Sequence, residues 1–433
     1  MNKQECAIKY VEDNYLQFNR LRHDIIADKL QVRCAHPIGD WLEAKGERQE
    51  QWREMTKHDI NSIVCHAAQE YDANITSREV MTALQSDLIP DVHPLREYVL
   101  SCGEWTEEQP DWIDWVASQV RVKPLGDEAK GDKARGERLW QGCFKKWFVA
   151  MVASWMKDEV VNHQVLVLIG KQGIFKTTWL EHLIPPHLRA YACKLANSND
   201  LNKDERLRIA EFGLISLDEI DSMNNRELNQ LKSVITATDV NERAAYAYTK
   251  ERRVRLASFC ASGNRRDFLT DITGNRRWLP FEVESIQNPF TTILPYERIY
   301  AQAWALAQDP LFSYWFDLEE IEVLEQHNQY FRDESNEEQL LPILFDVPAE
   351  DRGEFMTTAQ ISERLVTYGN IKKPMALSRL GMVLGTAGFR AVTRKAGSGR
   401  ARGWIVYQRD NDEIKNLRRL LKDETSQLDT AIY

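Results

Sequence analysis

The segment 165–178, Val-Leu-Val-Leu-Ile-Gly-Lys-Gln-Gly-Ile-Phe-Lys-Thr-Thr, constrains the fold of this chain most strongly. Its five consecutive aliphatic residues favour a strand buried on both faces of a parallel sheet, and Lys176 to Leu183 has the pattern of a helix. A strand that turns through glycines into a helix beginning with Lys-Thr is typical of a phosphate-binding loop. The N-terminus of such a helix points backbone N–H groups at an anion. The sequence therefore predicts an α/β fold built around a nucleotide site.

The phosphate-binding loop pattern predicts a role for several of its residues. Glycines let the backbone curl around phosphate oxygens, Lys176 reaches the β- and γ-phosphates, and the Thr177 hydroxyl ligates magnesium, so ATP and Mg²⁺ are the expected cofactors. Phe175 departs from the pattern G-x-x-x-x-G-K-[ST], which has glycine before the lysine. A glycine-rich strand-to-helix turn without a ligand is the alternative. The predicted nucleotide-binding residues are Gly170, Lys171, Gln172, Gly173, Ile174, Phe175, Lys176, Thr177 and Thr178.

A second apolar run, 213–219, ends in the adjacent carboxylates Asp218 and Glu219. A P-loop NTPase needs one acid at the end of a neighbouring strand to hold magnesium, and a second acid to orient the attacking water. We expect Asp218 to take the first role and Glu219 the second; a strand end that simply meets solvent is the alternative. A third predicted strand, Val254 to Ser262, precedes Asn264, whose side chain we expect to contact the γ-phosphate or the attacking water.

The sequence Gly-Asn-Arg-Arg occurs twice, at 263–266 and at 274–277. An arginine supplied to a neighbouring subunit's nucleotide stabilises the charge that develops during phosphoryl transfer. Arg276 and Arg277 are the candidates for this role, which requires a homo-oligomer closed into a ring. A surface turn with solvated arginines is the alternative.

Four segments together resemble the virulence-associated E family of phage and mobile-element ATPases: 93–98, Gly170 to Thr178, Leu217-Asp218-Glu219 and 273–278. The resemblance covers roughly residues 90–285. The family is similar to superfamily 3 helicases, whose P-loop NTPase core is of AAA+ type. The resemblance implies an ATPase that couples hydrolysis to DNA translocation or unwinding in replication, as a ring or hexamer. It also implies a sensor role for Asn264.

The region after the Asp-Glu pair is the predicted contact with single-stranded DNA. Asn224 and Glu227 fit a capping box for a helix from about 225 to 237. The stretch 241–255 then alternates like two strands joined by a polar turn near 249–251. Related helicases project a hairpin from this position into the ring channel; an edge hairpin with solvated arginines is the alternative. The expected contacts are Arg243, Tyr246, Tyr248, Lys250, Arg252 and Arg253.

Residues 371–408 carry eight Lys or Arg and no Asp or Glu, within a chain of net charge −10. A capping box at 357–360 opens a predicted helix to about Leu365, and a second helix is expected from Met375 to Ala387. Strands at 389–394 and 403–407 follow, joined by a basic turn. This is the order of a winged-helix domain, which binds duplex DNA in many proteins and serves protein contacts in others. The expected duplex contacts are Arg379, Arg394, Lys395, Arg400 and Arg402.

Composition and patterning limit the localisation and the domain organisation of the protein. Seven cysteines without a C-x-x-C pair, no signal-peptide pattern and no long apolar run indicate a soluble cytoplasmic protein without a membrane segment. No cluster of carboxylates suited to a primase is found, so a primase is expected to be a separate protein. The predicted regions are a helical accessory or oligomerisation region at 1–90, a helical region at 91–160 with an exposed loop at 125–137, the ATPase core at 161–285, a helical lid at 286–333, a linker at 334–353, the winged-helix-like domain at 354–410 and a tail at 411–433.

The motifs leave three classes of function open. An ATP-driven helicase or translocase accounts for the most features. A nucleotide-gated switch or assembly factor that does not unwind DNA processively is the alternative, and Phe175 suits it. A small-molecule kinase fits poorly, because the Asp-Glu pair and the distal Arg-Arg motif belong with hydrolysis between subunits.

Overall fold

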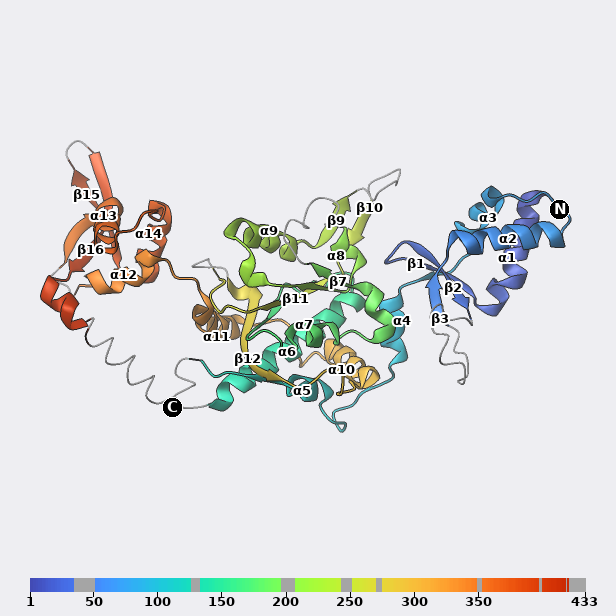
Figure 1. Ribbon diagram of the computed structural model, residues 1–433, viewed down its shortest axis with the longest axis horizontal. Helices are drawn as coiled ribbons and strands as arrows, with labels where there is room; N and C mark the ends of the chain where they lie inside the picture. Colours follow the sequence, from blue (N-terminus) through green and yellow to red (C-terminus); the bar gives the residue numbers. More distant parts are fainter. Residues whose placement is uncertain are drawn as a thin grey trace. The chain divides into compact units, whose positions relative to one another are not determined.

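The computed structural model describes residues 1–34, 51–125, 133–195, 207–242, 251–269, 275–348, 353–396, 399–417 and 419. The chain forms two compact units (Figure 1). The first comprises Met1–Arg265 and Arg277–Leu324, and the second comprises Arg266–Arg276 and Glu325–Tyr433. The predicted mixed α/β fold with a parallel sheet is confirmed.

The first unit is organised around a six-stranded sheet in the order β5-β12-β6-β11-β8-β7. Strands β12, β6, β11, β8 and β7 run parallel, and β5 pairs antiparallel at one edge. Every residue of β6, β8 and β11 is buried, which explains the continuous apolar sequence of β6 and the small or apolar residues of β8 and β11. The strands are β5 (Val120–Val122), β6 (Val165–Ile169), β7 (Ala192–Leu195), β8 (Leu214–Leu217), β11 (Ser258–Gly263) and β12 (Trp278–Ile286).

Helices that are rich in aromatic residues pack against this sheet and form hydrogen bonds to its backbone. Trp147 and Trp155 of the long helix α6 are fully buried, and their indole N–H groups donate to the carbonyls of Phe259 and Gly213 at 3.1 Å each. Burial of a large apolar side chain contributes roughly 2 to 3 kcal/mol, and the indole bonds satisfy its polar atom. The surrounding helices are α4 (Pro94–Ser101), α5 (Trp112–Ala117), α6 (Lys133–Met156), α10 (Tyr296–Gln308) and α11 (Leu318–Asn328).

The chain order creates a crevice at the carboxyl end of β6. From β6 the chain passes through α7 (Lys176–Glu181) to β7 at one edge, and it returns through β8 and β11 before crossing to β12 on the other side of β6. Ligands of open α/β sheets bind outside the carboxyl ends of strands at such a reversal. The fold therefore presents the loop after β6 at its most favourable binding position.

The N-terminal region is not purely helical, contrary to the expectation for 1–90. It contains a four-stranded sheet in the order β3-β2-β1-β4 together with three helices. Its strands are short and rich in charged residues, such as Arg22, which pairs with Gln31 and Glu97. A short polar strand carries little sequence signal. The elements are α1 (Lys3–Asn14), η1 (Leu16–Phe18), β1 (Leu21–Asp24), β2 (Lys29–Cys34), β3 (Gln51–Glu54), α2 (Lys57–Glu70), α3 (Ser77–Leu84) and β4 (Asp91–Val92).

The second unit packs helices α12, α13 and α14 against a small sheet in which β16 pairs with β13, β14 and β15. The predicted linker at 334–353 is wrong, because α12 begins there with a capping box of Ser335 and Glu338. Leu341, Leu344 and Phe345 of this segment are buried in the core of the unit, and its acidic Glu337 is buried as well. The elements are α12 (Asn336–Leu344), β13 (Phe345–Asp346), β14 (Glu354–Thr357), α13 (Thr358–Gly369), α14 (Leu377–Thr386), β15 (Arg390–Ala396) and β16 (Gly399–Gln408).

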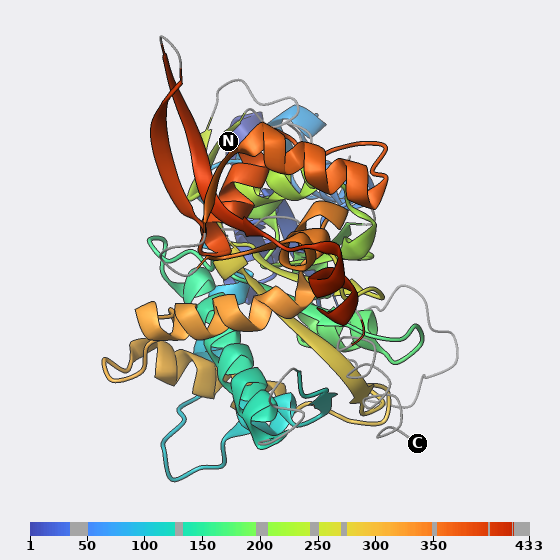
Figure 2. The same cartoon turned by 90° about the vertical axis from the view of Figure 1, so that its left-hand side faces the viewer.

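The hairpin of β15 and β16 is longer than predicted. Its strands continue to Ala396 and from Gly399, so Lys395, Arg400 and Arg402 belong to strands and not to a turn. Figure 2 shows this ribbon extending beyond the helices of its own unit. The glycines and basic residues resembled a loop, but cross-strand pairing decides where a hairpin turns.

Of the other local predictions, some are confirmed and some are not. The helix α9 (Asn225–Thr236) has the capping box of Asn224 and Glu227, and the helix α13 has its predicted cap at Thr357. The third predicted strand is displaced, because Val254 ends β10 and β11 begins only at Ser258. The predicted loop 125–137 lies mostly outside the described residues, and its last five residues belong to α6. Among the described helices, none is long and apolar enough to cross a membrane.

Candidate nucleotide site

The loop after β6 is held close to the neighbouring strands. The Gly170 N–H donates to the Gly263 carbonyl at 3.1 Å. A Cβ atom at Gly170 would lie 2.8 Å from the Val283 carbonyl oxygen, so this position admits only glycine. Gly173 has φ +82°, a conformation that favours glycine in the turn. Both glycines thus have a structural reason within the predicted phosphate loop.

Lys176 folds back over this loop. Its ammonium group donates to the carbonyls of Gly170 at 2.8 Å and Lys171 at 2.7 Å, and to Asn264 Oδ1 at 3.3 Å. The residue is only 7% exposed. Burial lowers the pKa of Lys176, against the opposing effect of the Asp221 and Asp218 charges. The lysine is thus positioned by carbonyl dipoles at the mouth of the loop.

Three oxygen-bearing side chains meet beside Lys176. Asp218 Oδ1 accepts hydrogen bonds from Ser262 Oγ at 2.8 Å and from Thr177 Oγ1 at 3.2 Å. The two hydroxyl oxygens lie 2.9 Å apart. Partial burial acts to raise the pKa of Asp218, but hydrogen bonds from Lys194, Ser262 and Thr177 outweigh it and lower the pKa. Hard oxygen donors of this kind fit Mg²⁺, so the residues present suit the predicted metal.

These groups border a cleft of about 340 Å³. The exposed Glu219, which has φ 52°, follows Asp218 directly and contributes to the same cleft. Gly170, Lys171 and Ile174 are not among the lining residues, so three of the nine predicted loop positions do not border the cleft. The lining consists of Gln172, Gly173, Phe175, Lys176, Thr177, Thr178, Asp218, Glu219, Ser262, Gly263 and Asn264.

Phe175 occupies the position where the loop pattern has glycine, and its backbone explains that pattern. It adopts φ 67° and ψ 16°, a left-handed conformation that glycine takes readily and that strains a larger residue. Its ring lies edge-on to Phe290, with 6.3 Å between ring centres. The phenylalanine therefore packs beside a neighbouring aromatic ring while it also borders the cleft.

Three residues of this site were missed by sequence reasoning. Asp221 accepts hydrogen bonds from the backbone N–H groups of Asn264 and Arg265 at 3.1 Å each, which fixes the end of β11. Ser262 is a polar residue near the carboxyl end of the buried strand β11, a signal that is visible in the sequence. Lys194 binds Asp218 Oδ2 at 2.8 Å, and this hydrogen bond raises the pKa of the lysine. Nothing in the sequence around Lys194 indicates that contact.

Arg277 lies at the end of the sheet where the parallel strands begin, whereas Lys176 lies at the end where they finish. The short helix η7 (Asn275–Arg277) leads directly into β12, whose first residue, Trp278, pairs with Val165 at the start of β6. The five residues of β6 separate the two edges by roughly 13 Å. Consistent with this placement, the charge of Arg277 acts on His163, which precedes β6. Arg276, the other candidate, is exposed.

The predicted DNA hairpin is present as a pair of strands, β9 (Asp239–Glu242) and β10 (Glu251–Val254), in antiparallel register. Of its proposed contact residues, Arg252 lies in β10 opposite Asn241. The remaining contact residues of the predicted turn lie outside the described residues, namely Arg243, Tyr246, Tyr248 and Lys250.

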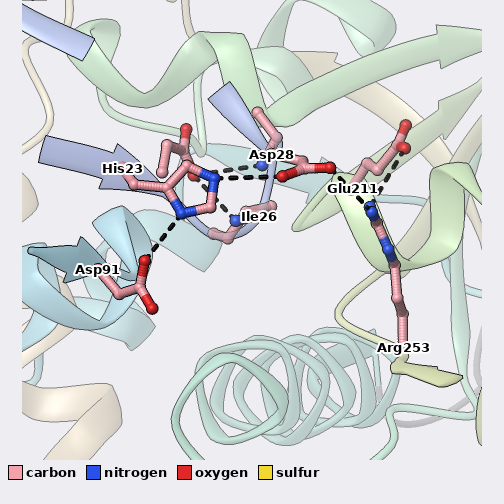
Figure 3. Close-up of polar contacts among 8 residues, drawn as sticks. His23, Ile26, Asp28, Asp91, Glu211 and Arg253 are labelled. Atoms are coloured by element: carbon pink, nitrogen blue, oxygen red, sulfur yellow. Dashed lines mark hydrogen bonds and ion pairs between the residues drawn. The ribbon is translucent and has the colours of Figure 1, made fainter. Parts of the chain in front are cut away.

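Arg253 of β10 binds acids of this same unit. Its Nη2 lies 3.3 Å from Asp28 Oδ2, and its Nη1 lies 3.7 Å from Glu211 Oε1 of the short helix α8 (Arg208–Glu211) (Figure 3). Asp28 also lies 3.1 Å from His23 Nε2, and His23 Nδ1 lies 2.8 Å from Asp91 Oδ1. Partial burial acts to lower the pKa of His23, but the two carboxylates outweigh it and raise the pKa. Arg253 is therefore neutralised in this arrangement.

The predicted duplex-binding residues do not share one surface. Lys395 pairs with Arg400, and Thr393 pairs with Arg402. Because side chains alternate along a strand, Lys395, Arg400 and Arg402 lie on one face of the ribbon and Arg394 lies on the other. All four of these basic residues are exposed. Only three of them can contact one partner through the same face.

The other two basic positions have different surroundings. The Arg394 guanidinium lies 5.1 Å from the ring centre of Phe355. Arg379 of α14 lies 3.8 Å from Glu338 of α12. An ion pair of this length at a partly exposed position contributes little stability, and it leaves the arginine partly neutralised.

Comparisons with known proteins find solved structures and one family model that are similar to this chain. Solved structures described as the A form apo structure of the NrS-1 C-terminal region and as the apo structure of the same region align with 11% and 12% identity. The alignments cover 90% and 92% of this chain and 98% and 99% of the other chains, with TM-scores of 0.43 and 0.42. No curated protein matches by sequence. The model of the virulence-associated protein E-like domain matches residues 131–333, so this part of the chain is similar to the virulence-associated E family, as the resemblance predicted.

Proposed function

We propose that this protein is an ATP-dependent DNA helicase or translocase that works as a ring-shaped replicative motor of a phage or mobile element. The observation that carries the proposal is the convergence of Lys176, Thr177, Asp218, Ser262 and Asn264 at one end of the sheet, beside the exposed Glu219. Three strands far apart in sequence supply these groups, which is the arrangement that phosphoryl transfer requires. The core is accordingly assigned as a P-loop NTPase of AAA+ and superfamily 3 type.

Each residue has a task in ATP hydrolysis. The loop at 170–175 surrounds the phosphates, and Lys176 exchanges its carbonyl partners for phosphate oxygens. Thr177 and Asp218 hold Mg²⁺, which supplies charge neutralisation when it is bound. Glu219 accepts a proton from the attacking water, for which its exposed carboxylate is suited. Asn264, fixed through its backbone by Asp221, orients that water.

The remote position of Arg277 favours action on a neighbouring subunit. An arginine at the amino edge of the sheet cannot serve the cleft at the carboxyl edge of the same subunit across roughly 13 Å of strand. Head-to-tail contacts bring these two edges together in a closed ring. Arg276 or Arg277 then stabilises the transferring phosphate in the adjacent cleft.

Two regions are assigned to DNA. The hairpin of β9 and β10 projects into the channel and contacts single strands, with tyrosines stacking on bases. The second unit, with helices α13 and α14 followed by the β15–β16 ribbon, is assigned as a winged-helix-like domain that binds duplex. The basic face of Lys395, Arg400 and Arg402 contacts phosphates. We place the protein in the cytoplasm, with a separate primase as a possible replication partner.

An ATPase assay with and without single-stranded DNA, together with strand displacement, tests the proposal. Lys176→Ala is expected to abolish nucleotide binding, whereas Glu219→Gln is expected to bind ATP but lose at least about a hundredfold in turnover. Lys29→Ala, which removes an exposed lysine paired with Glu54, serves as the control and is expected to behave as wild type. Turnover by Glu219→Gln at the wild-type rate would exclude the assigned role of this carboxylate.

A nucleotide-gated switch that does not unwind DNA is the second candidate. It is favoured by Arg253, which binds Asp28 and Glu211 and is not free for DNA in this arrangement. Nucleotide binding without stimulation by single strands and without strand displacement would support this candidate over the motor.

A further inference from the structure

Lys194 is a cation placed directly on the predicted magnesium ligand. It lies in β7, next to β8, where it pairs with Ser216, and the Asp218 N–H continues this ladder by donating to the Leu195 carbonyl at 3.1 Å. The Lys194 ammonium reaches Asp218 Oδ2 at 2.8 Å and lies 4.0 Å from Glu181 Oε1. Its side chain is 47% exposed, so the fold does not depend on its burial.

The strand order separates Lys194 from the phosphate loop. From β6 the sheet continues through β11 and β8 to β7, so the two backbones lie three strand spacings apart, about 14 Å. Lys194 therefore approaches Asp218 from the side away from Lys176. This position argues against a phosphate contact within the same subunit and makes Asp218 the group on which the charge of Lys194 acts.

Asp218 does not need Lys194 for its orientation. Its Oδ1 atom already accepts hydrogen bonds from Thr177 of helix α7 and Ser262 of strand β11. The contribution specific to Lys194 is its positive charge on the second oxygen. A cation at this distance weakens the attraction of the carboxylate for a divalent ion, because like charges repel.

Resting on the proposed nucleotide site, we propose that Lys194 is a specificity-determining residue that makes the cleft discriminate against a free divalent cation. Lys194 brings a second positive charge, in addition to Lys176, to the adjacent carboxylates Asp218 and Glu219, so it reduces the negative charge that a free cation meets there. A nucleotide triphosphate adds negative charge, so cation and nucleotide bind together. Lys194 thereby couples metal occupancy to the arrival of nucleotide.

Direct binding of Mn²⁺, followed by electron paramagnetic resonance without nucleotide, tests this inference without turnover. Lys194→Met is expected to bind Mn²⁺ about tenfold more tightly than wild type, the size of effect that one unit charge exerts on a divalent ion at a few ångströms in water-like surroundings. Lys194→Arg keeps the charge and is expected to bind as wild type. Lys29→Met is the matched control, since it removes an exposed lysine from a carboxylate partner in the N-terminal sheet.

A second titration with a non-hydrolysable ATP analogue separates the two proposals. With the analogue present, wild type and Lys194→Met are expected to bind Mn²⁺ with affinities that differ by less than about threefold, because the phosphates then dominate the local charge. Equal or weaker Mn²⁺ binding by Lys194→Met without nucleotide overturns the role of Lys194 alone. Failure of the analogue to promote Mn²⁺ binding in wild type overturns the nucleotide site itself.

Discussion

Arg253 and Asp28 lie 225 residues apart in the chain, yet the arginine Nη2 donates to the aspartate Oδ2 at 3.3 Å. This contact ties the second strand of the predicted DNA hairpin to the turn between β1 and β2 of the N-terminal sheet. Because Asp28 also binds His23, the N-terminal region and the hairpin share one network of charges (Figure 3). The charge environment of Arg253 therefore depends in part on residues of the N-terminal sheet.

We predict that Asp28→Asn strengthens the binding of single-stranded DNA. The substitution removes one of the two carboxylates that neutralise Arg253 and leaves only the longer Glu211 contact at 3.7 Å. If the arginine then exchanges that contact for a phosphate, the slope of log affinity against log salt should steepen by about 0.7. Asp91→Asn is the matched control, because it removes the other carboxylate on His23 without touching Arg253. Identical salt slopes for wild type and Asp28→Asn would show that Arg253 contacts no DNA.

Phe175→Gly is predicted to bind ATP as tightly as wild type or more tightly. Glycine accepts the left-handed backbone at this position without strain, which relieves about 1 kcal/mol, and it removes bulk beside the phosphates. Phe175→Ala removes the ring but keeps the strain, so it separates the two effects. Loss of nucleotide binding in both variants, measured with a fluorescent ATP analogue, would assign the aromatic ring to the site.

Complementation between two inactive variants tests the remote arginine. Mixed assemblies of Arg277→Ala and Lys176→Ala are predicted to recover part of the ATPase activity, because some interfaces then combine an intact loop with an intact arginine. Activity is measured across mixing ratios, with mixed assembly verified by native mass spectrometry. Absence of recovery at every ratio would place the function of Arg277 within its own subunit.

The face of the β15–β16 hairpin that carries Lys395, Arg400 and Arg402 leads to a prediction for duplex binding. The triple change of Lys395, Arg400 and Arg402 to alanine is predicted to weaken duplex binding similarly for all sequences and to reduce the salt slope by roughly three. Arg394→Ala is the control on the opposite face of the ribbon and should have a smaller effect. Equal losses from the triple change and from Arg394→Ala would argue against a single contacting face.

The stability contributed by His23 is predicted to depend on pH. Its pKa in the folded protein is raised by Asp91 and Asp28, so the contribution is fully present below the unfolded pKa and is lost as pH rises through the folded value. Wild type should therefore exceed His23→Gln in thermal stability by more at pH 5.5 than at pH 8.5. His66→Gln, at an exposed position of α2, should show no such pH dependence in the same melting experiments.

Local patterns in the sequence were sufficient to predict the strand, the loop and the helix that form the candidate nucleotide site. The apolar run at 165–169, the glycines after it and the Lys-Thr pair predict strand, loop and helix because the requirements of each act over a few residues. The capping boxes at Asn224 and Thr357 predict helix starts for the same reason. The convergence of Lys176 with Asp218 also follows, since parallel strands share a carboxyl edge.

Only the tertiary structure decided which partners these residues meet. The ion pair of Lys194 with Asp218 depends on β7 lying beside β8, and the contact of Arg253 with Asp28 depends on how a distant sheet packs. The acidic residues and prolines of the segment 334–353 suggest a linker, but residues 336–346 form a helix and a strand, because the apolar run 340–345 packs into a core made with later elements. Such outcomes arise from contacts between residues far apart in the chain, whose free energies no local pattern contains.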